Sequence, residues 1–144
     1  METTGIIDAI CYDPETVDRV ELVGRITTAD GLMRLLDAYN WNDGYDVPTA
    51  VALHPAADLA VALNLYWLAN ADEWFGNPEP PEEEYELQNF AFGRMMTERI
   101  LSGCYSVGTT SYDPGFNRVA LYHLRKGNFP EVLYTPVVGK ATTP

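Results

Sequence analysis

The amino-acid sequence predicts an all-α or nearly all-α fold, organised as a single domain of about five or six helices with a short extended C-terminal segment. Residues that cap helices precede apolar runs at several points of the chain. Within those runs the apolar residues follow helical spacing. A length of 144 residues and a hydrophobic content of 47% suffice for one core without a metal or a disulfide. We therefore expect residues 1–144 to form one helical domain.

Two amphipathic helices are expected near the start of the chain. The first runs from Pro14 to about Val23, because an Asp-Pro pair is a helix-start signal and Gly24 stands near its end. The second begins near Thr27 and Asp30, which resemble a capping box. Its apolar positions, at i, i+3, i+4 and i+7, are Leu32, Leu35, Leu36 and Tyr39. That spacing predicts that one face of the second helix packs against a core.

The middle of the chain predicts a turn and two further helices. Asn42-Asp43-Gly44 is typical of a turn. Pro48 then opens a short helix, which His54-Pro55 ends because the residue before a proline avoids the helical region. Asp58 caps the next helix, from Leu59 to about Asn70, whose side chains are apolar on nearly every side. We expect that helix to form the centre of the core.

A loop rich in proline and glutamate, residues 76–84, separates the buried helix from a longer one. The longer helix is expected from about Glu83 to Ser102, and Gly103 is a natural helix stop. The next stretch, from Cys104 to Ser111, is consistent with a loop or a short strand.

The C-terminal part of the chain allows two interpretations. One is a helix that begins near Asp113, with helical spacing at Phe116, Val119, Ala120, His123 and Leu124. The other is a β-hairpin that turns through Arg125 to Asn128. The Asp-Pro pair at residue 113 favours the helix. Residues 131–138 are expected to lie over the core as an extended segment.

The charge of the chain is strongly negative and unevenly distributed. The formal net charge is −12. Residues 1–93 contain 18 of the 21 acidic residues and 3 of the 9 basic ones. Such a field repels phosphate backbones and anionic lipid, so nucleic acids and membrane surfaces are disfavoured as partners and a basic protein is favoured.

The compartment follows from a few features of the sequence. The two cysteines, Cys11 and Cys104, lie far apart and form no C-x-x-C motif, which favours a reducing compartment. The N-terminus has no basic region followed by a long apolar run, so no signal peptide is visible. The longest apolar stretch, residues 59–71, is interrupted by Asn64 and Asn70 and falls short of a membrane span. We expect a cytoplasmic protein.

An aromatic-bracketed Asn-Asp-Gly turn, a His-Pro corner and a capped apolar helix occur together in the first half of the chain. The residues are Tyr39-Asn40-Trp41-Asn42-Asp43-Gly44, Pro48, His54-Pro55, Asp58, Ala62-Leu63 and Tyr66-Trp67-Leu68. This pattern resembles a small bacterial family known as domain of unknown function 4274. The resemblance covers roughly residues 32–71, and residues 27–71 form the family-like core.

The resemblance implies no catalytic residue, because that family has no established activity. Proteins of this kind look like the small acidic immunity proteins encoded beside polymorphic-toxin genes, which suggests a role by analogy of family. The sequence departs from the family's pattern by a helix before Thr27 and by the Pro/Glu-rich loop. Either addition is a candidate for contacts with one particular partner.

Combinations of residues that carry out catalysis or bind metals are weak in this sequence. His54 and Asp58 are four residues apart, but they are better explained as a hydrogen-bonded corner between two helices. Nothing near Cys104 and His123 supports a thiol–imidazole pair. The cysteines and histidines lack zinc spacing, the run from Asn42 to Asp46 is too short for a calcium loop, and no phosphate loop is present. We expect no catalytic residue, metal or cofactor.

The acidic segment, residues 72–86, is the strongest candidate for a functional site. It contains seven acids and no base, with aromatic residues between them. The candidate partner-binding residues are Asp72, Glu73, Trp74, Glu79, Glu82, Glu83, Glu84, Tyr85 and Glu86. One interpretation is an interface in which aromatic anchors stand inside a charged rim. The other is a loop that only keeps the protein in solution, with Trp74 closing the end of the buried helix.

These features favour a non-enzymatic cytosolic binding protein. The most concrete form of this hypothesis is an immunity protein that neutralises a basic toxin domain by covering it. Two alternatives stay open: a small hydrolase-type enzyme that uses His54 or His123, and a housekeeping adaptor or scaffold. The oligomeric state does not follow from the sequence.

Overall fold

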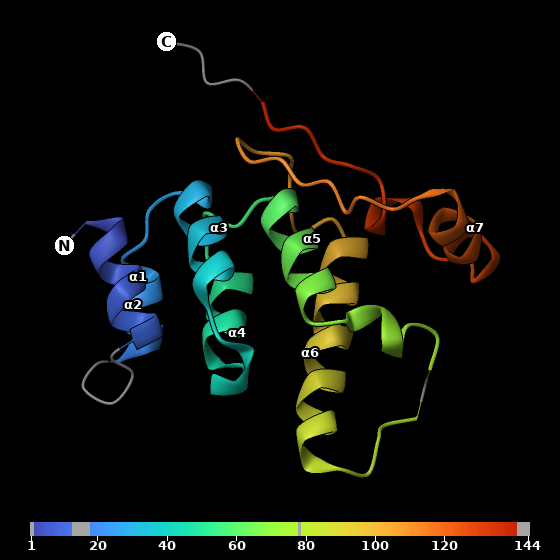
Figure 1. Ribbon diagram of the computed structural model, residues 1–144, viewed down its shortest axis with the longest axis horizontal. Helices are drawn as coiled ribbons and strands as arrows, with labels where there is room; N and C mark the ends of the chain where they lie inside the picture. Colours follow the sequence, from blue (N-terminus) through green and yellow to red (C-terminus); the bar gives the residue numbers. More distant parts are fainter. Residues whose placement is uncertain (1, 13–17, 78, 141–144) are drawn as a thin grey trace.

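The computed structural model describes residues 2–12, 18–77 and 79–140, and within them the chain is helical (Figure 1). The α-helices are α1 (Thr3–Tyr12), α2 (Arg19–Gly24), α3 (Ala29–Ala38), α4 (Asp46–Ala52), α5 (Leu59–Leu68), α6 (Glu84–Leu101) and α7 (Arg118–Lys126). Three short 3-10 helices are η1 (Trp41–Asp43), η2 (Ala71–Trp74) and η3 (Glu131–Leu133). The described residues contain no strand, only one isolated antiparallel bridge between Tyr112 and Val137. The all-α prediction is confirmed, with more helices than the five or six expected.

The helices follow one another along the long axis of the molecule (Figure 1). The pair α1 and α2 lies at one end and contacts α3 and α4, which in turn contact α5. Helix α6 packs against α5 on the other side and also against η2. Helix α7 lies at the far end, with Leu124 as its one buried residue. None of the helices in the described ranges has the length and hydropathy to cross a membrane.

Helix α5 is the centre of the core, as its apolar sequence predicts. Every residue from Ala60 to Tyr66 is buried. Asp58 begins the helix by accepting a hydrogen bond from the backbone N–H of Val61 at 3.0 Å. A helix that is apolar all round has no solvent face, so it requires neighbours on several sides, and α3, α4 and α6 provide them.

Helices α3 and α4 also match the sequence pattern closely. The four predicted apolar positions of α3, Leu32, Leu35, Leu36 and Tyr39, are buried. The N-cap is Thr28 and not Thr27, because the Thr28 hydroxyl accepts from the N–H of Gly31 at 3.0 Å. Helix α4 begins two residues before Pro48, so the proline lies in the first turn, where its missing N–H costs nothing.

The N-terminal prediction was incomplete. Of the helix expected from Pro14 to Val23, residues 13–17 lie outside the described residues, and α2 begins at Arg19 behind an Asp18 N-cap. The sequence interpretation missed α1, which buries Ile6, Ile7 and Ile10. The spacing of these three isoleucines is the signal that would have predicted it.

The C-terminal helix begins later than expected. Helix α7 starts behind Asn117, whose side-chain oxygen accepts from the N–H of Ala120 at 2.9 Å. Asp113 caps a turn instead, accepting from the N–H of Gly115 at 2.8 Å. The alternative hairpin is wrong, because Arg125 and Lys126 form the last turn of α7.

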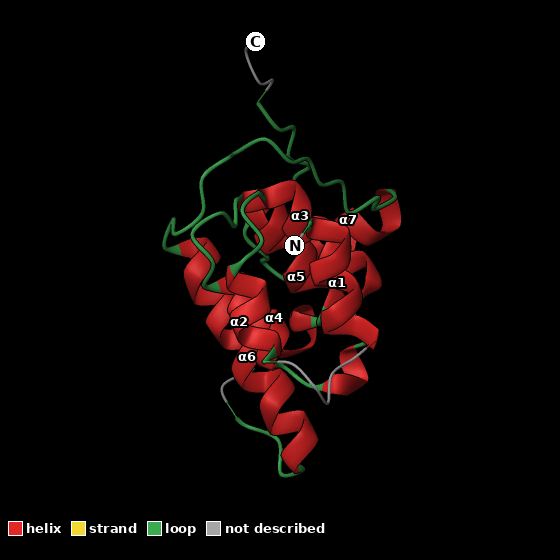
Figure 2. Ribbon diagram, turned by 90° about the vertical axis from the view of Figure 1, so that its left-hand side faces the viewer, coloured by secondary structure: helices red, strands yellow, loops and turns green. Residues whose placement is uncertain are grey.

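Two irregular segments run side by side across the end of the helix array at which α5 begins (Figures 1 and 2). Tyr112 and Val137 exchange backbone hydrogen bonds of 2.9 and 2.8 Å between them. Buried Asp58 accepts from both the N–H and the hydroxyl of Thr110, which fixes the first segment to the start of α5. The expected extended segment at 131–138 begins as η3, where the carbonyl of Leu133 accepts from the indole N–H of Trp67 at 2.8 Å.

Candidate protein-binding face

The acidic segment extends from η2 through the Pro/Glu-rich loop into the first turn of α6. Five of its acids, Glu73, Glu79, Glu82, Glu83 and Glu84, are exposed, while Asp72 and Glu86 are half-buried. The ion pairs among the described residues join Arg19 to Asp43 and Asp46, and Arg25 to Glu21. No acid of the segment takes part in one, so its negative charge is not compensated within the described part of the chain.

The two aromatic candidates of the segment differ in their surroundings. Trp74 is half-buried, and its indole N–H donates to the side-chain oxygen of Asn89 at 2.5 Å. Its ring meets the ring of Phe90 edge to face, with 5.5 Å between centroids. Tyr85 is 70% exposed. Trp74 is therefore held in place by the fold, whereas the Tyr85 ring is presented to solvent.

Asn89 organises this face, and the sequence interpretation did not single it out. Besides accepting from Trp74, its amide nitrogen donates to the hydroxyl of Tyr45 at 2.6 Å and to the carbonyl of Ala69 at 2.8 Å. The side chain thus joins the turn after α3, the end of α5, η2 and α6. No sequence signal marked it, since its partners lie between 15 and 44 residues away.

A cavity of about 440 Å³, which we call the acidic groove, opens beside Trp74. One wall comes from the turn that contains η1, and the other from η2 and the first turns of α6. Its lining residues are Trp41, Asn42, Gly44, Tyr45, Ala69, Asn70, Glu73, Trp74, Tyr85, Glu86, Gln88 and Asn89. Two carboxylates, four aromatic rings and four side-chain amides therefore surround it, and no basic side chain is among them.

The turn that forms the first wall is rigidly built. Asn40 caps η1, its side-chain oxygen accepting from the N–H of Asn42 at 3.0 Å. Gly44 follows with a φ of +105°, a conformation that side-chain-bearing residues rarely adopt. The hydroxyl of buried Tyr39 donates to the carbonyl of Gly44 at 2.8 Å. The turn predicted from Asn42-Asp43-Gly44 thus positions Trp41 and Tyr45 at the groove.

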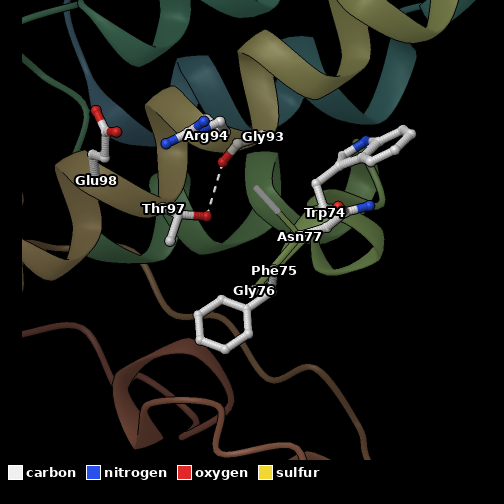
Figure 3. A pocket seen from close by; sticks show the side chains of 8 residues that line it. All are labelled: Trp74, Phe75, Gly76, Asn77, Gly93, Arg94, Thr97 and Glu98. Carbon is white, nitrogen blue, oxygen red and sulfur yellow. Dashed lines mark hydrogen bonds between the residues drawn. The ribbon is translucent and has the colours of Figure 1, made fainter. Parts of the chain in front are cut away.

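A second cavity, of about 350 Å³, lies between residues 74–77 and α6 (Figure 3). Its α6 wall is Gly93, Arg94, Thr97 and Glu98. A Cβ at Gly93 would stand 3.2 Å from the Trp74 ring, so glycine lets η2 approach α6 closely. The Thr97 hydroxyl donates to the carbonyl of Gly93 at 2.8 Å, as Figure 3 shows. Trp74 belongs to the lining of both cavities.

The structure gives His54 and Asp58 separate hydrogen-bond partners. The Nδ1 atom of His54 accepts from the N–H of Ala56 at 2.9 Å, so its Nε2 atom is the donor to the carbonyl of Ile26 at 2.7 Å. Both ring nitrogens are occupied, and Asp58 binds Val61 and Thr110 instead. The arrangement is that of a corner tied to its neighbours, with no free base.

The remaining candidate reactive residues, Cys104, His123 and Cys11, each have different surroundings. Cys104 is exposed beside the hydroxyl of Ser102 at 3.3 Å, and His123 is exposed on α7 against the ring of Tyr122. Burial, followed by the negative charge of Asp8, raises the pKa of the Cys11 thiol, which makes this cysteine a poor nucleophile. Within residues 2–12, 18–77 and 79–140, no three side chains of the His, Cys, Asp and Glu types come together as a metal site would require.

In a comparison with known families, the model of the domain of unknown function DUF4274 matches residues 28–101. The chain belongs to the DUF4274 family. No curated protein and no solved structure shows significant similarity to this chain.

The DUF4274 region begins at the N-cap of α3 and ends with the last residue of α6. It reaches beyond residues 32–71, which resembled the family in the sequence, and it includes the Pro/Glu-rich loop. All residues that line the acidic groove lie within it. Helices α1, α2 and α7 and the C-terminal segment lie outside, so the acidic groove is a feature of the family's own part of the chain.

Proposed function

We propose that this protein is a cytosolic immunity protein, a non-enzymatic binder that neutralises a basic toxin domain by covering its functional surface. The observation that carries the proposal is the uncompensated charge of the acidic segment. Seven acids lie together there, and none is paired with a base in the described part of the chain. A toxin that acts on an anionic target needs a basic surface, to which such a segment is attracted.

The chemistry of the face supports binding better than catalysis. The exposed acids form a charged rim, and Tyr85 stands among them as an exposed aromatic ring. Interfaces commonly combine such a rim with a few aromatic anchors that become buried on binding. Charges on the rim mainly accelerate association, while the anchors slow dissociation. The histidines offer no comparable arrangement, since His54 is hydrogen-bonded to the backbone and His123 is exposed on α7 against the ring of Tyr122.

The test begins with capture of a partner from the producing cell or by co-expression with the neighbouring gene product. Its association rate is then measured for the wild type and for a variant with Glu79, Glu82, Glu83 and Glu84 changed to Gln. We expect this variant to associate about tenfold more slowly at low salt and to show a weaker dependence on salt, because the Debye length falls from about 10 Å at 0.1 M to about 3 Å at 1 M.

The matched control removes the same number of charges elsewhere. Glu2, Asp8, Asp30 and Asp37 are exposed, lie outside the acidic segment and form no ion pair among the described residues. Changing them to amides should slow association much less. Equal slowing by both variants would show that only net charge matters, and wild-type association by the first variant would refute the proposal.

A further inference from the structure

From the acidic groove we infer the chemistry of the partner: the groove receives an arginine side chain from the basic protein. This inference rests on the proposed function, because the source of the arginine is that partner. The groove combines the two kinds of group that bind a guanidinium well, carboxylates for its N–H donors and aromatic rings for its flat faces.

The carboxylates reach the groove from two directions. Glu73 comes from η2 and Glu86 from the first turn of α6. Neither forms an ion pair among the described residues. Arg19, which contacts the η1 turn, is bound to Asp46 at 2.9 Å and to the carbonyl of Asp43 at 3.2 Å. The groove carboxylates therefore have no neutralising cation within the described part of the chain.

The aromatic part of the groove is held in a fixed arrangement. The ring of Trp41 meets Tyr45 and Phe92 edge to face, with 5.8 and 6.0 Å between centroids. Asn89 fixes the rings of Tyr45 and Trp74 through their polar atoms. A groove that exists before binding loses little conformational entropy when it is filled, which favours a specific ligand over a diffuse charge attraction.

The second cavity does not share this chemistry. It is lined mainly by apolar atoms, and it contains Arg94, which would repel a cation. The acidic groove contains carboxylates, amide oxygens and rings instead. A lysine would satisfy the charge, but its ammonium group is compact and strongly hydrated, whereas a guanidinium can bind a carboxylate with two N–H groups and stack on a ring.

The test uses a small probe, Nα-acetyl-arginine-N-methylamide, titrated into the full-length protein while ¹H–¹⁵N spectra are recorded. The indole N–H signals of the three tryptophans show whether the probe binds near each ring. Trp41 and Trp74 line the groove, and Trp67 is bonded to Leu133 and lines neither cavity. We expect saturable shifts at Trp41 and Trp74 and none at Trp67. The corresponding lysine derivative should bind at least about fivefold more weakly, and the neutral citrulline derivative should cause no saturable shift.

Two double variants separate the groove from the general charge. Glu73→Gln with Glu86→Gln should weaken binding of the arginine probe about tenfold or more. Asp30→Asn with Asp37→Asn removes the same charge from exposed positions outside the acidic segment and should change binding less than about twofold. Equal shifts with the citrulline derivative, equal affinity for the lysine derivative, or equal loss in both double variants would overturn the inference.

If the arginine probe leaves Trp41 and Trp74 unchanged while the loop charge variant still slows association with the captured partner, the groove inference falls and the proposed function stands. If the probe binds the groove but partner association is insensitive to the loop charges, the proposed function falls, and the groove is then a guanidinium site without the partner proposed here.

Discussion

The indole nitrogen of Trp74 and the side-chain oxygen of Asn89 are joined by a hydrogen bond of 2.5 Å, which ties η2 to α6. The same asparagine donates to Tyr45 and to the carbonyl of Ala69. One side chain in the first half of α6 thus holds three other segments of the DUF4274 region around a common point.

Replacing Asn89 by Ala should destabilise the protein more than its half-buried position suggests. Three hydrogen bonds disappear, and their partners are left in a partly desolvated site, so we expect a loss of about 2–4 kcal/mol in the free energy of unfolding. Urea denaturation measures this loss. The neighbouring Gln88 is exposed, and Gln88→Ala is the matched control, expected to change stability by less than about 0.5 kcal/mol. A loss below about 1 kcal/mol for Asn89→Ala would contradict this account.

The Asp58–Thr110 contact should behave as one cooperative unit. The Thr110 hydroxyl lies 2.6 and 2.7 Å from the two carboxylate oxygens of Asp58, and both residues are buried. We expect Thr110→Val to cost about 1–3 kcal/mol and Asp58→Ala about 2–4 kcal/mol, since the second change also removes the cap of α5. In a double-mutant cycle, the sum of the two single-variant losses of stability should clearly exceed the loss measured for the double variant. Full additivity would show that the contact contributes nothing. Thr109→Val, at an exposed position, is the control.

The two histidines should respond differently to substitution. His54 bonds to the backbone through both ring nitrogens, so His54→Ala should cost about 1–3 kcal/mol. His123 is exposed, and His123→Ala should change stability by less than about 0.5 kcal/mol. Thermal denaturation compares the two variants. Both folded variants should retain binding to the captured partner, and a folded histidine variant that lost a measurable enzymatic turnover would revive the hydrolase alternative.

Stability should fall at alkaline pH through Tyr39. Burial, followed by the negative charge of Asp46, raises the pKa of Tyr39 to about 12, against about 10 in the unfolded chain. The resulting stabilisation is complete below pH 10 and is lost as the pH rises from about 10 to about 12, because the unfolded state releases its proton first. Over this pH interval, we expect the free energy of unfolding of Tyr39→Phe to fall by about 2–3 kcal/mol less than that of the wild type. Urea denaturation at each pH measures the free energy of unfolding of both proteins. The prediction would be contradicted if the two free energies fell in parallel as the pH rises.

Tyr85 and Trp74 should affect partner binding in different ways. Tyr85→Ala removes an exposed ring and should leave stability nearly unchanged while speeding dissociation from the captured partner by about tenfold or more. Trp74→Ala should first lower stability, because it breaks the contacts with Asn89 and Phe90. Dissociation measured by surface plasmon resonance, with denaturation curves alongside, separates the two effects. A wild-type dissociation rate for Tyr85→Ala would remove this ring from the interface.

Local sequence patterns predicted helices α3 and α5 well. Helix α5 follows from an apolar run behind Asp58, and α3 from four apolar residues at helical spacing, because these signals lie within one element. Helix starts were harder to place. Asp113 and Asn117 both cap backbone N–H groups, but the first does so in a turn and the second at α7, and only the surrounding packing decides between them.

The acidic groove could not be predicted as a cavity. The sequence indicated both of its walls, the turn that follows α3 and the acidic segment, but as separate features. They come together because α6 packs back against α5 and η2, a contact set by tertiary packing. Asn89 shows the same limit, since an asparagine within a helix has no special spacing until its three partners are in place.

The position of Trp74 between two cavities has a thermodynamic consequence. Because Trp74 forms part of both linings, a ligand that shifts this residue in one cavity also changes the shape of the other. The two cavities are then linked, and linkage of this kind is reciprocal: any factor by which an occupant of the first changes affinity at the second acts equally in the reverse direction. A partner that fills both cavities at once would thus bind with a free energy that differs from the sum of its two separate insertions.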